Sequence, residues 1–228
     1  MSPPPTSIDG TDITGATIDG QEVQEITVDG DTVFTASPTI VDNFESGNLT
    51  NGGWSGKTGS YDVNSSFPVE AGTFSVKYTS SGGNNRIGTS SGVDKVPDVG
   101  DTHTFYVHPA NASNSITSTW FASDSISGRN NGHEIKTRAD NNLVQFNTWV
   151  NGSPNFGVAT ENVTVGSQWY KWECLHEADG SFTFTFFDSD GETQLAQLTG
   201  TDSTHITSGS YDNTNVQLED GRGEGDAW

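Results

Sequence analysis

Residues 133–138 and 143–150 alternate between apolar and polar side chains on either side of Asp140 and Asn141. This alternation predicts two antiparallel strands with one apolar face, so their polar side chains must point away from the core. The polar set consists of Glu134, Lys136, Arg138, Gln145, Asn147 and Trp149. The expected register pairs Glu134 with Asn147, Lys136 with Gln145, and Arg138 with Leu143.

The residue types of this polar set suit carbohydrate recognition. Sugars are bound by an aromatic side chain that stacks on the ring, together with planar hydrogen-bonding groups such as Arg, Asn and Gln. We therefore expect a glycan site in which Trp149 stacks on a sugar while Arg138 and Asn147 bind its hydroxyl or carboxylate groups. The alternative is a solvated sheet face that carries only cross-strand charge pairs.

A third alternating segment, residues 169–176, extends this expectation. Tyr170, Trp172 and Cys174 would be buried, whereas Lys171 and Glu173 would point outward. We expect Lys171 to join Lys136 and Arg138 on one face, which would then hold three of the nine basic residues of the chain.

Catalytic motifs are absent from the sequence. Glycoside hydrolysis needs two carboxylates on opposite sides of the scissile bond, whereas residues 133–138 offer one acid and two bases on their polar face. The five histidines lack the His-x-x-x-His and His-Glu-x-x-His spacings, and there is no Gly-x-Ser-x-Gly motif or phosphate-binding loop. We therefore do not expect an enzyme.

One short turn offers ligands for a metal ion. Asp188, Asp190 and Glu192 alternate along it, and closely spaced carboxylates are ligands that Ca²⁺ accepts. A structural calcium site is therefore one expectation for this turn. An ordinary hairpin turn is the alternative, because Asp190-Gly191 is itself a strong turn signal.

The elements that would position these residues are β-strands. From about residue 40, short alternating segments are separated by Gly, Asn, Asp and Ser turns, without the 3.6-residue apolar stripe of a helix. Phe182, Phe184 and Phe186 predict one buried face. Further strands are expected at 103–108, 117–122, 133–138, 143–150, 169–176, 194–199 and 214–219. So many strands predict an all-β fold of two antiparallel sheets packed face to face.

Four stretches in this order carry a resemblance to a known family: Asp42–Leu49, Arg138–Asn141, Gln168–Trp172 and Gly180–Asp188. Over roughly residues 40–228 the chain resembles the concanavalin A-like lectin/glucanase (jelly-roll) domains of secreted and viral proteins of halophilic archaea. The resemblance implies a jelly-roll sandwich, in which glycan binding is common. It also implies a second location for structural calcium, where the first and last strands meet. The residues at that location are Asp42, Glu45, Glu224 and Asp226.

Residues 1–37 contain a repeat with a spacing of ten: Ile8-Asp9-Gly10, Ile18-Asp19-Gly20 and Val28-Asp29-Gly30. Asp-Gly between β-branched residues predicts tight hairpins. Because such hairpins bury too little surface to be stable alone, we expect residues 1–37 to anchor the protein to other subunits. Docking on the chain's own sandwich is the alternative. Pro38 marks the expected boundary, with the sandwich over residues 38–228. The repeats also resemble modules at the start of haloarchaeal tailed-virus structural proteins.

The chain is strongly acidic, with 30 Asp and Glu against nine Lys and Arg and a formal net charge of −21. Nucleic acid is not an expected partner, because phosphate binding needs clustered Lys and Arg. Molar salt, with a screening length of about 3 Å, would suppress the self-repulsion of such a chain. We therefore expect a halophilic protein. An acidic mesophilic surface protein is the alternative.

Sorting signals give a mixed picture. There is no run of 18 apolar residues and no signal peptide at Met1, so neither membrane insertion nor general secretion is expected. Cys174 is the only cysteine, which excludes a disulfide within the chain. Glycosylation acceptors of the Asn-x-Ser/Thr type nevertheless suggest an extracellular surface; they are Asn48, Asn64, Asn111, Asn151 and Asn162. A particle released by lysis would reconcile these observations.

These patterns favour a virion structural protein on the particle surface, such as a capsid turret or decoration or a tail fibre. It would form homo-oligomers and attach to host-surface glycans. A secreted or cell-surface carbohydrate-binding module of a halophilic archaeon is the alternative, and a glycoside hydrolase is the least favoured hypothesis. The hairpin repeat and the absent signal peptide favour the first.

Overall fold

The computed structural model describes residues 44–51, 53–66, 73–80, 85–89, 98–125, 128–213 and 215–228 in full, together with short backbone strands between residues 7 and 35. The chain divides into two compact units, Met1–Ile40 and Val41–Trp228. No helix in the described part of the chain has the length and apolar character needed to span a membrane.

The described residues of the first unit form three two-stranded hairpins, and in the sequence Asp-Gly separates the two strands of each. The hairpins are β1 (Ser7–Ile8) with β2 (Thr11–Asp12), β3 (Thr17–Ile18) with β4 (Gln21–Glu22), and β5 (Glu25–Val28) with β6 (Asp31–Thr35). Pairs such as Ile8 with Thr11 and Val28 with Asp31 leave two-residue loops. The predicted hairpins are therefore confirmed.

One sheet of the second unit has four antiparallel strands in the order β11-β16-β17-β18. Their bounds are Thr102–Val107, Tyr170–His176, Ser181–Phe187 and Gln194–Thr201. Phe182, Phe184 and Phe186 are at most 3% exposed, whereas Thr183 between them is half-buried on the other face. The three phenylalanines, which alternate with polar residues in the sequence, thus form one buried face, as predicted.

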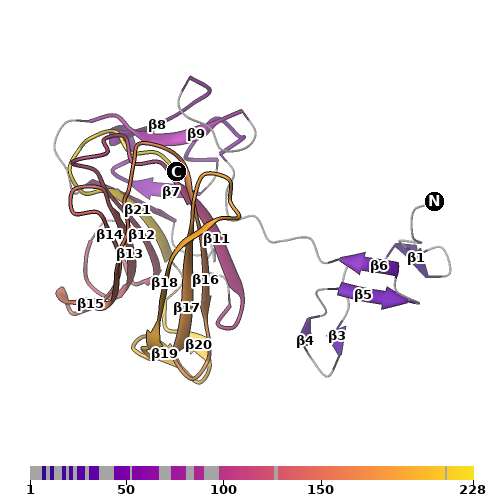
Figure 1. The fold of residues 1–228 in the computed structure, drawn as a ribbon. Coiled ribbons are helices and arrows are strands. Elements are labelled where there is room, and N and C mark those ends of the chain that lie inside the picture. Colours follow the sequence, from indigo (N-terminus) through magenta and orange to yellow (C-terminus); the bar gives the residue numbers. More distant parts are fainter. Residues whose placement is uncertain are drawn as a thin grey trace. The chain divides into compact units, whose positions relative to one another are not determined.

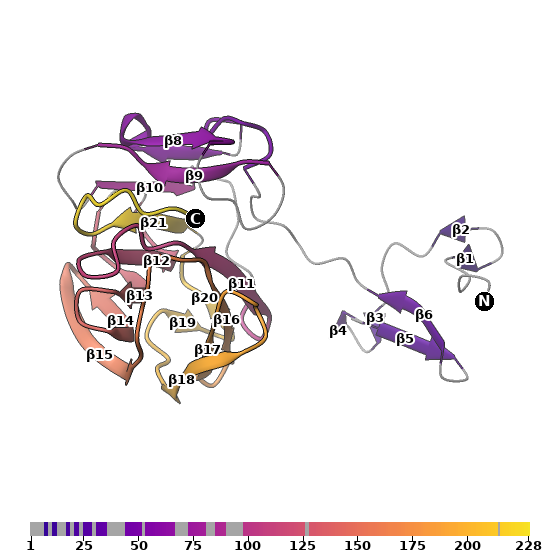
Figure 2. The same cartoon turned by 45° about the horizontal axis from the view of Figure 1, so that its top comes forward.

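The other sheet has seven strands in the order β15-β14-β13-β12-β21-β10-β7. Their bounds in that order are Ser153–Asn162, Leu143–Val150, Gly132–Arg138, Ile116–Ser123, Asn215–Asp220, Asn85–Thr89 and Trp54–Gly56. All its pairs are antiparallel, and Figure 2 shows β10, β21, β12, β13, β14 and β15 side by side.

The two sheets form two layers with the hydrophobic core between them (Figure 1). Phe121, Ile135 and Phe146 of the seven-stranded sheet join the core with the phenylalanines of β17. Phe146 packs edge to face on Phe182 and Phe184, with ring centroids 4.8 and 4.9 Å apart. Such aromatic pairs add about 0.5–1.5 kcal/mol each beyond their buried area.

Smaller elements close the ends of the sandwich. They are β8 (Tyr61–Asn64) with β9 (Ser75–Tyr78), β19 (Ile206–Thr207) with β20 (Ser210–Tyr211), and the 3₁₀ turn η1 (Thr58–Ser60). Ala227 bridges β9 and the end of β11, because it pairs with both Lys77 and His108.

The architecture confirms the predicted fold class, an all-β jelly-roll sandwich of antiparallel sheets. Each strand expected from alternation is present within one or two residues of its predicted bounds. Six strands in the described part of the second unit were not predicted: β7, β8, β10, β15, β19 and β20. Of these, β15 changes the interpretation of the predicted glycan site most.

Candidate functional site

The six predicted glycan contacts lie on one face of the seven-stranded sheet, in the predicted register. The side of this sheet that is turned away from the four-stranded sheet is called the outer face below. Neighbouring strands extend it: Trp120 faces Glu134, and Gln217 faces Trp120 in turn. Ser118 faces Lys136, Glu219 faces Ser118, and Arg86 faces Glu219. The outer face is therefore a continuous polar surface across five strands.

Three of the six residues are buried, which corrects the expectation of a solvent-facing platform. Glu134 and Asn147 are 0% exposed and Trp149 is 5% exposed. Glu134 Oε2 accepts hydrogen bonds from Asn147 Nδ2 and Trp149 Nε1, both at 3.0 Å, and pairs with Lys136 Nζ at 3.1 Å. Trp149 thus has a structural role, namely to hold a buried carboxylate, and it is not free to stack on a sugar in this arrangement.

Arg129 contributes to this burial, because its guanidinium carbon lies 5.4 Å from the centroid of the Trp149 ring. The strand β15, at the edge of the sheet, also contributes. Its register with β14 shifts, because Thr148 pairs with Asn155 but Phe146 pairs with Ala159. Residues 156–158 therefore bulge opposite Asn147. Gly157 adopts a φ of 68° there and donates its backbone N–H to Asn147 Oδ1 at 2.9 Å. A bulge of this kind turns a side chain out of the ordinary alternation.

Phe156 is the side chain that this bulge places over the outer face. Its ring meets the Trp149 ring edge to face at 5.8 Å, and Lys136 Nζ lies 5.4 Å from its centroid. Phe156 is nevertheless 59% exposed. The accessible aromatic side chain of the outer face is therefore Phe156, which the sequence analysis did not single out.

The loop between β12 and β13 covers another part of the outer face. Arg129 from this loop forms an ion pair with Glu219, whose carboxylate also accepts both Arg86 Nε (2.8 Å) and Arg86 Nη2 (2.9 Å). The backbone carbonyls of Ser125 and Gly128 accept hydrogen bonds from the Gln217 side chain. Glu219 and Gln217 are consequently 0% exposed.

Four buried polar atoms of the outer face have no hydrogen-bond partner among the described residues: Ser118 Oγ, Trp120 Nε1, Glu134 Oε1 and Gln217 Oε1. Two are donors or donor-acceptors and two are acceptors. Buried polar groups almost always have a partner, so a group of unpartnered ones on one face calls for a functional or solvent explanation.

The other three predicted contacts remain partly accessible. The side chains of Lys136 and Arg138 are 12% and 24% exposed, and Gln145 is half-buried. Arg138 binds Asp140 through two hydrogen bonds, Nε to Oδ1 at 3.0 Å and Nη2 to Oδ2 at 2.8 Å. These three residues and Phe156 form the accessible part of the outer face.

Lys171 does not share this surface, which corrects a prediction. It lies on β16, in the four-stranded sheet, where it pairs with Glu173 at 2.9 Å and contacts the Phe187 ring at 4.5 Å. Alternation predicted that Lys171 points outward, but alternation does not reveal to which sheet a strand belongs.

At the second predicted calcium location, each described carboxylate binds donors of the protein itself. Glu45 accepts two backbone N–H groups of residues 73–74, Glu224 accepts two asparagine side-chain amides, and Asp226 accepts the backbone N–H of Ala110. Asp42 lies outside the described residues. Within the described part of the chain, no group of three or more His, Cys, Asp and Glu side chains is placed to hold a metal ion.

The alternative calcium location is a self-contained turn between β17 and β18. Asp190 accepts the backbone N–H groups of Glu192 and Thr193, at 2.9 and 2.8 Å. Asp188 accepts the Gln168 side-chain amide and the N–H of Ser189. These contacts fit the alternative expectation of an ordinary hairpin turn. Calcium binding stays a prediction at both locations.

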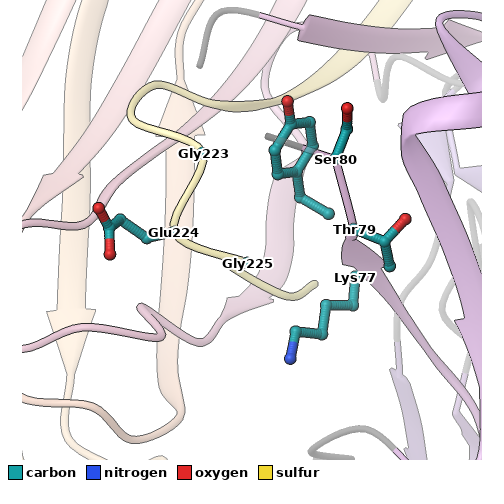
Figure 3. Close-up of a pocket in the computed structure, with 7 residues that line it drawn as sticks. Lys77, Thr79, Ser80, Gly223, Glu224 and Gly225 are labelled. Atoms are coloured by element: carbon teal, nitrogen blue, oxygen red, sulfur yellow. The ribbon is translucent and has the colours of Figure 1, made fainter. Parts of the chain in front are cut away.

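A surface hollow of about 350 Å³ lies between the end of β9 and the loop after β21. Figure 3 shows Lys77, Thr79 and Ser80 on one side and Gly223–Gly225 on the other, with the Glu224 carboxylate pointing away from Thr79 and Ser80. The hollow thus offers few side chains that converge on a ligand.

Two buried carboxylates lie near this hollow. Asp220 accepts the backbone N–H groups of residues 222–226. Asp226 is also 0% exposed, and its Oδ2 has no partner among the described residues. Burial, together with the charges of Asp220 and Glu224, raises the pKa of Asp226 to about 7.

Three histidines from distant strands and loops gather at one end of the core. The His133 ring lies 5.1 Å from the His176 ring and 5.4 Å from the His205 ring. Burial lowers the pKa of His133 and the neighbouring His176 lowers it further, so the ring is neutral in the folded protein. The spacing of these residues in the sequence gave no sign of this cluster, which packs against Phe121 and Phe146.

Comparison with one solved structure supports the fold. No family model and no curated protein matches the sequence. Among solved structures, a protein of unknown function from Shewanella oneidensis MR-1 is 15% identical, covers 80% of this chain and 78% of its own, and has a TM-score of 0.52. A carbohydrate-binding module from Bacillus subtilis is 16% identical, with coverage of 77% and 90% and a TM-score of 0.49. A β-glucanase from Bacillus licheniformis is 14% identical, with coverage of 60% and 64% and a TM-score of 0.38.

Proposed function

We propose that this protein binds glycans on the outer face of its seven-stranded sheet, around Phe156. The observation that carries the proposal is the placement of this ring. A bulge in β15 presents Phe156 at 59% exposure over a polar sheet face, with Lys136 Nζ 5.4 Å from its centroid. An exposed aromatic ring beside hydrogen-bonding side chains is the arrangement that binds a sugar ring.

The polar side chains around Phe156 are of the types that fix sugar hydroxyls. Lys136 and Arg138 are donors, and Gln145 is both a donor and an acceptor. Gln145 Nε2 lies within 3.4 Å of the position that a Cβ on Gly157 would take, so it is close to the bulge. Lys136 is held by its ion pair with the buried Glu134. A rigid support of this kind reduces the entropy lost on binding.

The unpartnered polar atoms of Ser118, Trp120, Glu134 and Gln217 lie beneath the surface, so a sugar on the outer face would not contact them directly. Ordered water, which is both a donor and an acceptor, could satisfy such a mixed set.

Binding, rather than hydrolysis, fits the state of the carboxylates on this face. Glu134 is in an ion pair with Lys136, and Glu219 is in ion pairs with Arg86 and Arg129. Both glutamates are also 0% exposed. Neither is therefore placed to reach a glycosidic oxygen as the general acid that glycoside hydrolysis requires.

The hairpins of residues 1–37 suggest a multivalent setting for this activity. We propose that they join several copies of the chain, or join it to another subunit, on the surface of a virus particle or a cell. Two-stranded hairpins are marginal alone. Linked weak sites gain roughly 10²- to 10⁴-fold in avidity, so assembly would turn a weak glycan site into an attachment device.

Replacement of Phe156 tests the proposal. Affinity electrophoresis of the full chain in gels that contain dextran, dextran sulfate, polygalacturonate or its methyl ester would measure binding to neutral and acidic polysaccharides. We expect Phe156→Ala to weaken binding of the retained polysaccharide roughly tenfold, which corresponds to about 1.4 kcal/mol.

Val150→Ala is the matched control, because Val150 is an exposed apolar residue (43%) on the neighbouring strand. This variant should bind as the wild type does. The proposal fails if no polysaccharide retards the wild-type chain, or if Phe156→Ala binds as tightly as Val150→Ala.

A further inference from the structure

Most basic side chains of the protein lie on or beside the outer face of the seven-stranded sheet. The four arginines of the chain and one of its five lysines lie on or beside it. These residues are Arg86, Arg129, Lys136, Arg138 and Arg222. The chain as a whole carries a net charge of −21, so this local gathering of cations runs against its overall composition.

Carboxylates on this face are fewer than the cations. Among the described residues, the five cations form ion pairs with three carboxylates: Glu134, Glu219 and Asp140. Asp124, in the loop that covers part of the face, binds the side-chain amides of Asn130 and Asn131. To neutralise a buried carboxylate, one cation is sufficient. A second arginine on one carboxylate, as at Asp140, therefore suggests a further anion.

Arg138 and Arg222 show this arrangement most clearly. Both guanidinium groups bind the same oxygen, Asp140 Oδ2, at 2.8 and 3.0 Å. Two cations that share one oxygen lie close enough to repel each other, which costs free energy unless another negative charge is present. The Asp140 side chain is 8% exposed, whereas those of Arg138 and Arg222 are 24% and 47% exposed. A ligand could therefore reach the arginines.

The arginine pair is also within reach of the proposed sugar platform. Arg138 and Lys136 are alternate residues of β13 on the same face, so their Cα atoms are about 7 Å apart. Lys136 in turn contacts the Phe156 ring. An oligosaccharide of two or three units stacked on Phe156 would extend past Lys136 to Arg138 and Arg222.

We infer that the glycan bound at this face is acidic, and that a carboxylate or sulfate group on it binds between Arg138 and Arg222. This inference rests on the proposed glycan function. The planar guanidinium fork matches carboxylate and sulfate oxygens and binds them through two parallel hydrogen bonds. At about 0.1–0.15 M salt, repulsion from acidic residues more than about 8–10 Å away is largely screened. Arg138 and Arg222, which contact the acidic group, therefore decide the specificity.

Matched neutral and acidic polysaccharides test the inference. We expect the full chain to bind dextran sulfate at least tenfold more tightly than dextran, or polygalacturonate at least tenfold more tightly than its methyl ester. The first comparison reports on sulfate and the second on carboxylate. Arg222→Gln, at an exposed position, should reduce either preference three- to tenfold and leave binding of the neutral polysaccharide unchanged.

Lys171→Gln is the control, because it removes one positive charge from an ion pair on the other sheet. It should leave the preference unchanged. Equal binding of the neutral and acidic partners, or an unaltered preference in Arg222→Gln, would overturn the inference while leaving the proposed glycan function intact. Failure to bind any of the four polysaccharides would overturn both.

Discussion

At the scale of single residues, the structure shows how burial changes what a side chain can do. Trp149 and Asn147 have the chemistry of sugar-binding residues, but both are committed to the buried carboxylate of Glu134. Their residue types and alternation were informative about which face they occupy. What covers that face depends on a bulge and a loop that alternation cannot reveal.

Asp226 leads to a prediction about pH. Its folded pKa of about 7 lies above its ordinary value of 3.8, so the folded protein keeps a proton that the unfolded chain has lost. The stability due to this group is thus fully present below pH 3.8 and is lost as pH rises to about 7. Each pKa unit corresponds to about 1.4 kcal/mol.

Asp226→Asn should therefore raise the melting temperature relative to wild type by an amount that grows between pH 4 and pH 7 and is constant above. The amide still accepts the hydrogen bond from Ala110. Thermal unfolding followed by circular dichroism at pH 4, 5.5, 7 and 8.5 measures this difference. Asp212→Asn, at an exposed position, should show no such growth. A difference that is independent of pH would contradict the assignment of the raised pKa to Asp226.

At the scale of elements, the sequence predicted the regular strands well and the irregular one poorly. Apolar and polar side chains alternate in segments such as 143–150 and 181–187, because one side of each strand packs on the core. This alternation can be recognised in the sequence. In contrast, β15 contains Pro154 and Gly157, which normally signal a loop. Proline is tolerated because β15 is an edge strand, and the glycine is required by the positive φ of the bulge.

The same argument explains which parts of the candidate site were missed. Arg86, Arg129 and Glu219 lie far apart in the sequence and meet only because β10 and β21 are neighbours and a loop folds over them. The spacing of residues within a short segment of sequence cannot predict which distant strands pair. The hairpin register that brings Glu134 opposite Asn147 was predictable because both strands flank one short turn.

At the scale of the whole molecule, the charge distribution links stability to the proposed function. A chain with a net charge of −21 repels itself at low salt, and its few arginines lie where they pair buried carboxylates. We expect the melting temperature to rise by several degrees between 0.1 and 2 M KCl, since each kcal/mol corresponds to about 2–4 °C for a chain of this size.

Sorbitol in place of KCl is the control for that measurement, because it stabilises folded proteins without screening charge. A melting temperature that does not change with KCl concentration, or that rises as much with sorbitol as with KCl, would contradict the prediction that the protein is halophilic. The glycan proposal does not depend on this result, since the residues around Phe156 are held by local contacts.

Hydrogen–deuterium exchange of the full chain with and without its bound polysaccharide tests the central claim most directly, because it locates the ligand on one face. Using whichever of the four polysaccharides is retained, we predict slower exchange in peptides that cover residues 128–138 and 151–160. Exchange should be unchanged in peptides that cover 188–193, at the turn between β17 and β18 of the four-stranded sheet. Protection confined to β16, β17 and β18, or binding that leaves 151–160 unprotected, would contradict a glycan site on the outer face.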